Sequence, residues 1–269
     1  MTRFAVGVEY DGGGFSGWQT QSGPNTIQAE LETALAGLLA HPVGVTGAGR
    51  TDAGVHSRGQ VVHFDTDARR SERALVLGTN TSLPPTVAVR WARTVPDHFH
   101  ARYSAVARTY RYCILNRLAR PGLGAGRVAF IHRPLDLQPM IEAGQALVGT
   151  HDFSSFRAAE CQAKSPVREL RELRLQRHGE FVFLEITANA FLHHMVRNIA
   201  GLLIHIGTGE ASPALAQELL VARNRRLAPA TAPAGGLYLW RVHYPPVFGL
   251  PDDSDIMVAA AGCPADLMV

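Results

Sequence analysis

Residues 47–65 read GAGRTDAGVHSRGQVVHFD, and the rest of the chain can be placed around them. Small residues surround one carboxylate, Asp52, and the arginines Arg50 and Arg58 stand on either side of it. The run QVVHFD that follows is short and mainly apolar, which is typical of a buried strand. A glycine-rich turn that leads into such a strand would hold its acid in one place, so this stretch predicts a positioned carboxylate. The alternative is a turn aspartate that hydrogen-bonds only its own backbone.

The first half of the chain predicts the element order β-α-β-β-α-β. Apolar residues alternate with period two in the expected strands and recur with a helical period in the expected helices. The strands are expected at 3–10, 43–46, 60–64 and 87–91, and the helices at 27–38 and 71–79. Asn25 and Gln28 predict a capping box at the start of the first helix. Trp18 ends a glycine-rich loop and is expected to be exposed.

The second half predicts a similar order, β-α-β-β-α-α-β. The strands are expected at 107–115, 167–177, 181–187 and 237–244, and the helices at 137–148, 192–207 and 212–222. The two middle strands are expected to form a hairpin that turns at His178 and Gly179. Ser212 and Pro213 are expected to start the last helix as its cap and its first residue.

These patterns predict an α+β fold made of two similar α/β halves. Each half is expected to have an antiparallel or mixed sheet flanked by helices, with an active-site cleft between the halves. The N-terminal half, with the Asp52 loop, is expected to span residues 1–105, and the C-terminal half residues 106–245. Residues 246–269 contain four aspartates but no lysine or arginine, and we expect this acidic tail to be mostly disordered.

Composition favours a globular enzyme that acts on a polyanion. Hydrophobic residues make up 46% of the chain and charged residues 18%, and no apolar run is long enough to span a membrane. The N-terminus has no signal-peptide pattern, so a cytoplasmic protein is expected. The three cysteines are far apart and predict neither a disulfide framework nor a structural zinc site. The net charge is +3, and because the tail is acidic the rest of the chain is more basic than that total.

Several other side chains are candidates for chemistry or binding. Arg50 and Arg58 could grip phosphate or pair with Asp52. Tyr110 lies in a strand that mixes rings and cations, which suits stacking on an unpaired base. Arg197 lies opposite the apolar stripe of its predicted helix. Each also has a structural interpretation, as a solvated arginine or as a tyrosine that fills a sheet face.

Other chemistries fit the sequence less well. The Asp52 loop lacks the Gly-Lys-Ser/Thr ending of a P-loop, which disfavours a nucleotide cofactor. An aspartic protease would need a second such aspartate turn, and none occurs. His193, His194 and Cys161 could in principle bind a metal, but their spacing matches no metal site.

Seven short motifs, taken together, resemble the tRNA pseudouridine synthase A family. In chain order they are AGRTDAGVH, GQVVHF, FHAR, TYRY, DFSSF, NAFLHHMVRNI and GLYL. The resemblance runs from Val6 to Tyr244. It implies the pseudouridine synthase fold and the conversion of uridine to pseudouridine at positions 38, 39 and 40 of the tRNA anticodon stem-loop. It also implies a homodimer that needs no metal and no cofactor.

The resemblance assigns a role to each matching residue. Asp52 would be the catalytic nucleophile, Arg197 its ion-pair partner, and Tyr110 the ring that stacks on the target uracil. Arg50 would occupy the space that the flipped base leaves, or hold phosphate.

Three further residues would line the substrate site. Arg58 would contact the substrate, and Leu237 or Leu239 would form its apolar floor. Whether Asp52 attacks C1′ or removes the C2′ proton stays open. Two other classes of protein also remain open: a tRNA-binding protein or folding chaperone without chemistry, and a metal-dependent hydrolase that uses His193 and His194.

Overall fold

A computed structural model describes residues 1–23 and 25–251 of the chain, and it divides into two compact units. The first comprises Met1–Val106 together with the chain from Tyr238 onward, and the second comprises Ala107–Leu237. The sequence-based division placed residues 238–245 in the C-terminal half. They group with the first unit instead, because the last strand pairs with a strand of that unit.

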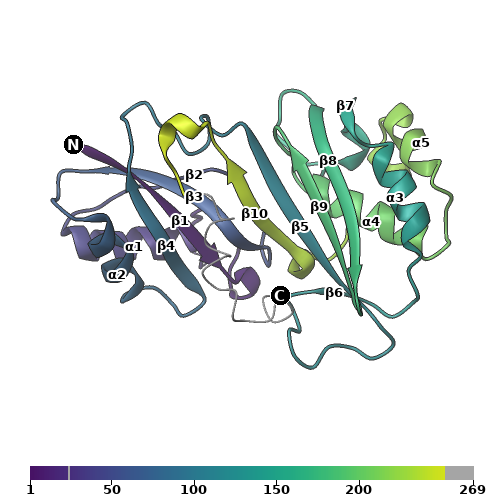
Figure 1. The fold of residues 1–269 in the computed structure, drawn as a ribbon, viewed down its shortest axis with the longest axis horizontal. Helices are drawn as coiled ribbons and strands as arrows, with labels where there is room; N and C mark the ends of the chain where they lie inside the picture. The colour runs from purple at the N-terminus through teal and green to yellow at the C-terminus, as the bar shows by residue number, and fades with distance from the viewer. Residues whose placement is uncertain (24, 252–269) are drawn as a thin grey trace. The chain divides into compact units, whose positions relative to one another are not determined.

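The first unit has a mixed sheet in the order β4-β1-β3-β10, with the short β2 added to β3 (Figure 1). Its strands are β1 (Thr2–Tyr10), β2 (Thr46–Gly47), β3 (His56–Thr66), β4 (Val87–Thr94) and β10 (Leu237–His243). β1 runs antiparallel to both β3 and β4, whereas β10 runs parallel to β3. The strand expected at 43–46 is reduced to β2, because side chains of Gln28 and Glu32 bind the backbone of Val45 in place of a neighbouring strand.

Two helices of the first unit, α1 (Ile27–Leu39) and α2 (Glu72–Asn80), pack against one another and contribute to its main hydrophobic core. The Ser71 side chain caps α2 by accepting from the Ala74 N–H group. The predicted capping box on α1 is wrong. Its cap is Thr26, which makes no side-chain capping bond, and the Gln28 carboxamide bonds to Gln19 and Glu32 instead.

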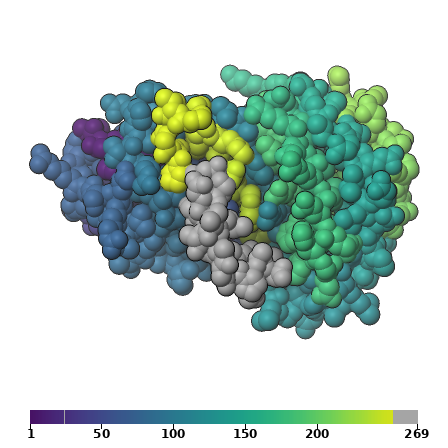
Figure 2. Space-filling view, in the orientation of Figure 1, coloured from purple at the N-terminus to yellow at the C-terminus, as the bar shows by residue number. Residues whose placement is uncertain are grey.

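A second apolar cluster of the first unit receives the segment after β10. Phe99 lies at its centre, and the rings of Tyr244 and Phe248 pack on it at 5.2 and 5.0 Å. Phe248, at the end of a 3₁₀ turn at Pro246–Phe248, and Leu250 pack on this cluster, so the first residues of the expected tail contribute to the core of the first unit. Figure 2 shows them among the yellow atoms at the surface of the first unit. The rest of the predicted tail, 252–269, lies outside the described residues.

The second unit also has a mixed sheet, in the order β5-β9-β8-β7, with β6 parallel to β5. Its strands are β5 (Ala107–Asn116), β6 (Ala129–Ile131), β7 (Gly149–Asp152), β8 (Val167–His178) and β9 (Phe181–Ala188). The predicted β8–β9 hairpin is confirmed, although His178 is the last residue of its strand and pairs with Phe181. The short strands β6 and β7 have no clear alternating pattern and were not predicted.

The second unit carries α3 (Leu137–Gln145), α4 (Met195–Gly207) and α5 (Leu215–Ala222). α4 begins three residues later than predicted, because His194 takes a left-handed conformation with φ of 61° and serves as its cap. The predicted start of α5 is wrong: its cap is Ala214, and Ser212 contributes only its carbonyl, which accepts from the Leu215 N–H group.

The remaining 3₁₀ turns lie at Gly12–Gly14, Ser154–Phe156, Arg225–Leu227 and Ala234–Gly236. Among the described residues, no helix is both long and apolar enough to cross a membrane. The prediction of two α+β halves with mixed sheets is thus confirmed, and each unit supplies its own part of the predicted site.

Candidate active site

Asp52 is half-buried in the connection between β2 and β3. The Val55 N–H group donates to the Asp52 carbonyl (3.1 Å), and Gly54 between them has φ of 75°. A tight turn of this kind requires a residue that adopts positive φ without strain, which is glycine. The turn therefore fixes the backbone that carries the carboxylate, as the sequence predicts.

The segment before α1 holds the same turn from another side. The Trp18 N–H group donates to the Thr51 carbonyl (3.0 Å), and the hydroxyls of Tyr10 and Thr51 are hydrogen-bonded at 2.8 Å. Gly17 has φ of 96°, and a Cβ there would lie 2.8 Å from the Thr51 carbonyl oxygen and 3.2 Å from the Asp52 carbonyl carbon. Position 17 must therefore be glycine for this segment to lie against the Asp52 turn.

Trp18 is buried, contrary to the expectation from the sequence. Its side chain is 2% exposed and stacks on the Tyr10 ring at 6.0 Å. It also lies on Gly47, where a Cβ would come within 2.9 Å of the indole. The glycine-rich segment before Trp18 is thus a framework for the Asp52 turn.

Gln60 is a supporting residue that sequence reasoning missed. It is fully buried, and its Nε2 donates to the Gly49 carbonyl (2.7 Å) while its Oε1 accepts from the Gly49 N–H group (3.4 Å). This paired contact ties the start of the Asp52 loop to β3. A glutamine inside the apolar run QVVHF was the available signal, because a buried amide must find hydrogen-bond partners.

The two arginines that bracket Asp52 differ in their surroundings. Arg50 is exposed on the loop, whereas Arg58 is half-buried on β3 with its guanidinium 4.6 Å from the Trp240 ring centroid. Arg50 is therefore placed to meet a ligand from solvent, and Arg58 is oriented by an aromatic face.

Tyr110 lies on β5 in the second unit. It is 8% exposed and packs edge-on against Phe191, with ring centroids 4.9 Å apart. Its neighbour on the same face, Tyr112, is fully buried and donates to the Pro233 carbonyl (2.8 Å), and burial raises the Tyr112 pKa far above its usual range. Arg111, on the other face of β5, forms an ion pair with Glu185 on β9.

Arg197 lies in the first turn of α4 and is half-buried. Its Nε donates to the Ala232 carbonyl (2.9 Å), and the Ala232 N–H group donates back to the Arg197 carbonyl (3.1 Å). The helix face with Arg197 and Gly201 is thus covered by the segment around residue 230. A Cβ at Gly201 would lie 2.1 Å from the Ala230 carbonyl oxygen, so glycine is required for this contact.

A buried polar network holds that covering segment, and sequence reasoning missed it. The Asn198 side chain, 2% exposed, donates to the Phe156 carbonyl (2.7 Å) and accepts from Arg225 Nη2 (3.1 Å) and Thr231 Oγ1 (2.7 Å). Arg225 also donates to two carbonyls of the same segment, those of Ala228 and Pro229. The only local signal was the polar Asn198 beside Arg197 in an otherwise apolar helix.

Leu237 and Leu239 lie two residues apart on β10 and are 5% and 0% exposed. Alternation along a strand puts both on one face. Tyr238, on the other face, stacks on His56 at 4.7 Å. Both leucines are therefore apolar and buried, as a pocket floor requires, and the choice between them stays a prediction.

The structure places three of the predicted residues in the first unit, Arg50 and Asp52 on the loop between β2 and β3 and Arg58 on β3. It places two others, Tyr110 and Arg197, on β5 and α4 of the second unit, elements that pack together. The first unit thus provides a carboxylate on a fixed turn, and arginines on the same loop and on the strand that follows it. The second provides an aromatic ring and a cation on rigid elements.

A family model described as tRNA pseudouridine synthase matches residues 7–104 and 143–245 of the chain. The tRNA pseudouridine synthase A of Methylococcus capsulatus is 55% identical over 94% of this chain and 93% of that protein. The protein of the same name from Pseudomonas aeruginosa is 55% identical over 94% and 89% of the two chains. That from Nitrosococcus oceani is 56% identical over 93% and 96%.

Proposed function

The chain belongs to the tRNA pseudouridine synthase family, and on this premise we propose that it converts uridine to pseudouridine at positions 38, 39 and 40 of the tRNA anticodon stem-loop. The observation that carries the proposal is the identity of 55–56% to three proteins named tRNA pseudouridine synthase A, over nearly their whole length and that of this chain. The glycine-framed Asp52 turn supports it, because it holds one carboxylate in place.

The reaction is an isomerisation. The N1–C1′ bond of uridine breaks, the uracil rotates, a C5–C1′ bond forms, the C5 proton leaves, and N1 takes up a proton. Atoms and electrons balance within the nucleotide and one proton transfer, so the reaction requires no redox cofactor, and we propose that the enzyme uses neither cofactor nor metal. The target base is stacked in the RNA, so it must flip out at a cost of a few kcal/mol, which contacts to phosphate and base can offset.

We assign the chemical roles in the first unit to its loop residues. Asp52 acts on the ribose, either as nucleophile at C1′ or as base at C2′. Arg50 is exposed next to it and fills the space left by the flipped base or binds its phosphate. Arg58, held on an aromatic face, contacts the substrate.

We assign binding and electrostatic roles to the second unit. Tyr110 stacks on the target uracil, and its packing against Phe191 supports this role by fixing the ring. Arg197 pairs with Asp52, and its contact with Ala232 limits the rotamers it can adopt. Leu237 or Leu239 provides the apolar floor that retains the detached base.

We further propose that the protein is a cytoplasmic homodimer with tRNA as its partner. The excess of basic residues outside the acidic tail supports a polyanionic partner. Size-exclusion chromatography with light scattering would test the dimer.

The decisive test is Asp52→Asn, which keeps the shape of the side chain and removes its charge. We expect tRNA binding to be retained and turnover to fall by roughly 10³-fold or more, as for removal of an essential catalytic group. Release of tritium from tRNA labelled at uracil C5 measures turnover, and Asp97→Asn, at an exposed loop position, is the matched control.

The outcomes separate the competing functions. Near-normal tritium release by Asp52→Asn would exclude the assigned role of Asp52. Tight tRNA binding by the unaltered protein without any tritium release would instead favour the tRNA-binding or chaperone function. Activity that survives exhaustive chelation would remove the metal-dependent hydrolase that relies on His193 and His194.

A further inference from the structure

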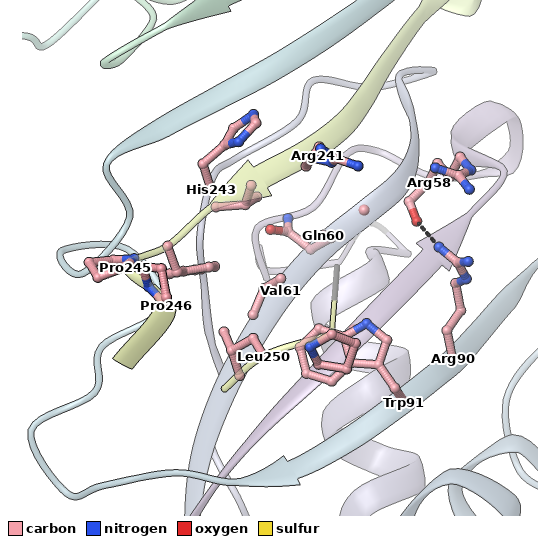
Figure 3. Close-up of a pocket in the computed structure, with 15 residues that line it drawn as sticks. Arg58, Gln60, Val61, Arg90, Trp91, Arg241, His243, Pro245, Pro246 and Leu250 are labelled. Atoms are coloured by element: carbon pink, nitrogen blue, oxygen red, sulfur yellow. Dashed lines mark hydrogen bonds between the residues drawn. The ribbon is translucent and has the colours of Figure 1, made fainter. Parts of the chain in front are cut away.

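The first unit contains a pocket of about 260 Å³ (Figure 3), and of the residues given catalytic or binding roles above only Arg58 lines it. Residues of four strands line it, β1, β3, β4 and β10, together with the chain that follows β10. Asp52 and Arg50 are not among the lining residues. The pocket is therefore a feature of the sheet, separate from the loop that carries the carboxylate.

The lining of this pocket is strongly basic. Arg58 comes from β3, Arg90 from β4 and Arg241 from β10, and His243 lies two residues further along β10. Within residues 1–23 and 25–251, no aspartate or glutamate lines it. Glu9, on β1, is the carboxylate that the structure pairs with Arg90, at 3.2 Å. Even with Glu9 included, the pocket has an excess of positive charge, which favours an anionic ligand.

The arginines are held in defined directions. Arg90 Nη1 donates to the Arg58 carbonyl (3.1 Å), and the Arg58 guanidinium lies over the Trp240 ring at 4.6 Å. Figure 3 shows the arginines on one side of the pocket and Pro245 and Pro246 on the other. Guanidinium groups held in this way lose little entropy when they bind an oxyanion.

Two close backbone approaches shape the base of the pocket. A Cβ at Gly7 would lie 2.2 Å from Nε1 of Trp91, so the indole rests directly on the strand. A Cβ at Gly59 would lie 2.4 Å from the Trp240 carbonyl oxygen, so β3 and β10 meet there without an intervening side chain. The lining thus combines planar cations with an aromatic ring, as in sites that hold a nucleotide phosphate next to its base.

We propose that this pocket binds a backbone phosphate of the RNA substrate, as a contact additional to those around the target uridine. The proposal rests on the proposed function only for the identity of the RNA as a tRNA. Guanidinium forks match the geometry of a phosphodiester. Arg241 is the residue to test, because Arg58 already has a role in the proposed function and Arg90 is paired with Glu9, whereas Arg241 lines the pocket from β10.

Arg241→Ala tests the proposal, with Arg73→Ala as a matched control because Arg73 is exposed on α2 and does not line the pocket. Arg241→Ala should weaken tRNA binding by roughly 10-fold at low salt, typical of one lost charged hydrogen bond. The slope of log Kd against log salt concentration should fall by about 1, whereas Arg73→Ala should leave both unchanged. Arg241→Lys should keep the slope and recover part of the affinity, since it restores charge but not the planar fork.

Two further ligands identify the source of the phosphate. If the contacted phosphate lies in the stem-loop, Arg241→Ala should weaken the binding of full-length tRNA and of the isolated anticodon stem-loop equally. If the phosphate lies elsewhere in the RNA, Arg241→Ala should weaken the binding of full-length tRNA only. Either result supports the proposal. If uridine monophosphate binds the unaltered protein in an Arg241-dependent manner while tRNA binding does not depend on Arg241, the pocket is a small-nucleotide site and the proposal is wrong.

The proposal is also overturned if Arg241→Ala and Arg73→Ala have the same affinity and slope. This failure is distinguishable from failure of the proposed function. If the unaltered protein releases tritium from tRNA while Arg241→Ala binds tRNA with unchanged affinity, the pocket alone is refuted. An unaltered protein that forms no pseudouridine but binds tRNA through Arg241 refutes the function alone.

Discussion

The Asp52 turn in the first unit and the first turn of α4 in the second hold their charged residues by different means. Around Asp52 the backbone itself is clamped, through Gly17, Gly54 and the paired contact of Gln60 with Gly49. Around Arg197 the support is a network of buried side chains centred on Asn198. An added side-chain atom therefore disrupts the backbone contacts around Asp52, whereas a removed side chain disrupts the network around Asn198.

The largest effect is expected from breaking the network. Asn198→Ala removes the amide that donates to the Phe156 carbonyl and accepts from Thr231 and Arg225. We expect the second unit to lose about 3 kcal/mol of stability, since a buried group that loses its hydrogen-bond partner costs about 1–3 kcal/mol. Urea denaturation followed by far-UV circular dichroism measures this loss. Asn25→Ala, at an exposed position, is the control.

Tryptophan fluorescence in the same experiment reports the unfolding of the first unit alone. All three tryptophans, Trp18, Trp91 and Trp240, belong to the first unit. The Asn198→Ala transition should therefore appear earlier by circular dichroism than by fluorescence. Coincident early transitions by both probes would show that the network stabilises the whole chain and not the second unit.

A smaller effect is expected from breaking the clamp. Gly17→Ala places a Cβ 2.8 Å from the Thr51 carbonyl at a strained φ, and this displaces the Asp52 turn. We expect kcat to fall roughly 100-fold with KM little changed, because a shift of about 1 Å in a catalytic group costs that much. Tritium release at saturating tRNA measures kcat.

Gly23→Ala provides the matched control for the clamp. Gly23 has nearly the same φ, 97°, but a Cβ there would meet no atom within 4 Å. If both variants lose the same activity, backbone strain and not the contact with the turn is responsible.

The smallest expected effect is a loss of stability of the first unit at acidic pH. His63 in the first unit accepts from the Ala101 N–H group, and burial, reinforced by the nearby His100, lowers its pKa to about 4. The unfolded chain binds a proton near pH 6.5 and the folded chain does not, so stability is full above that pH and is lost as the pH falls toward 4. The expected loss is about 2 kcal/mol between pH 7.5 and pH 5.

Urea denaturation followed by tryptophan fluorescence at the two pH values measures this loss. His63→Asn should abolish most of the pH dependence, because its carbonyl oxygen can accept the same hydrogen bond but does not titrate in this range. An unchanged pH dependence in His63→Asn would assign the acid sensitivity to another group.

The sequence predicted the features of the site that depend on local chemistry. The Asp52 turn was predictable because glycine at 54 and the apolar run after it are adjacent in the chain. The long strands and α1 were predictable from the spacing of their apolar residues alone. The predicted strand boundaries were wrong where residues distant in the sequence determine them. An example is Val45, whose backbone is bound by side chains from α1.

The supporting contacts were not predictable, for a physical reason. Trp18 is buried because Gly47 leaves room for its ring, and nothing near residue 18 carries that information. Asn198 and Arg225 are 27 residues apart with no periodic relation, so their contact exists only once α4 and the following segment have folded together. The basic pocket was not predictable either, because its three arginines come from three different strands.

The parallel pairing of β10 with β3 has a consequence for how the protein is made. Tyr238 pairs with His56, so the sheet of the first unit is incomplete until residue 238 has left the ribosome. The second unit is continuous in sequence and is complete one strand earlier. During synthesis the second unit can therefore finish folding before the first unit has its last strand, which reverses the usual N-terminal-first order.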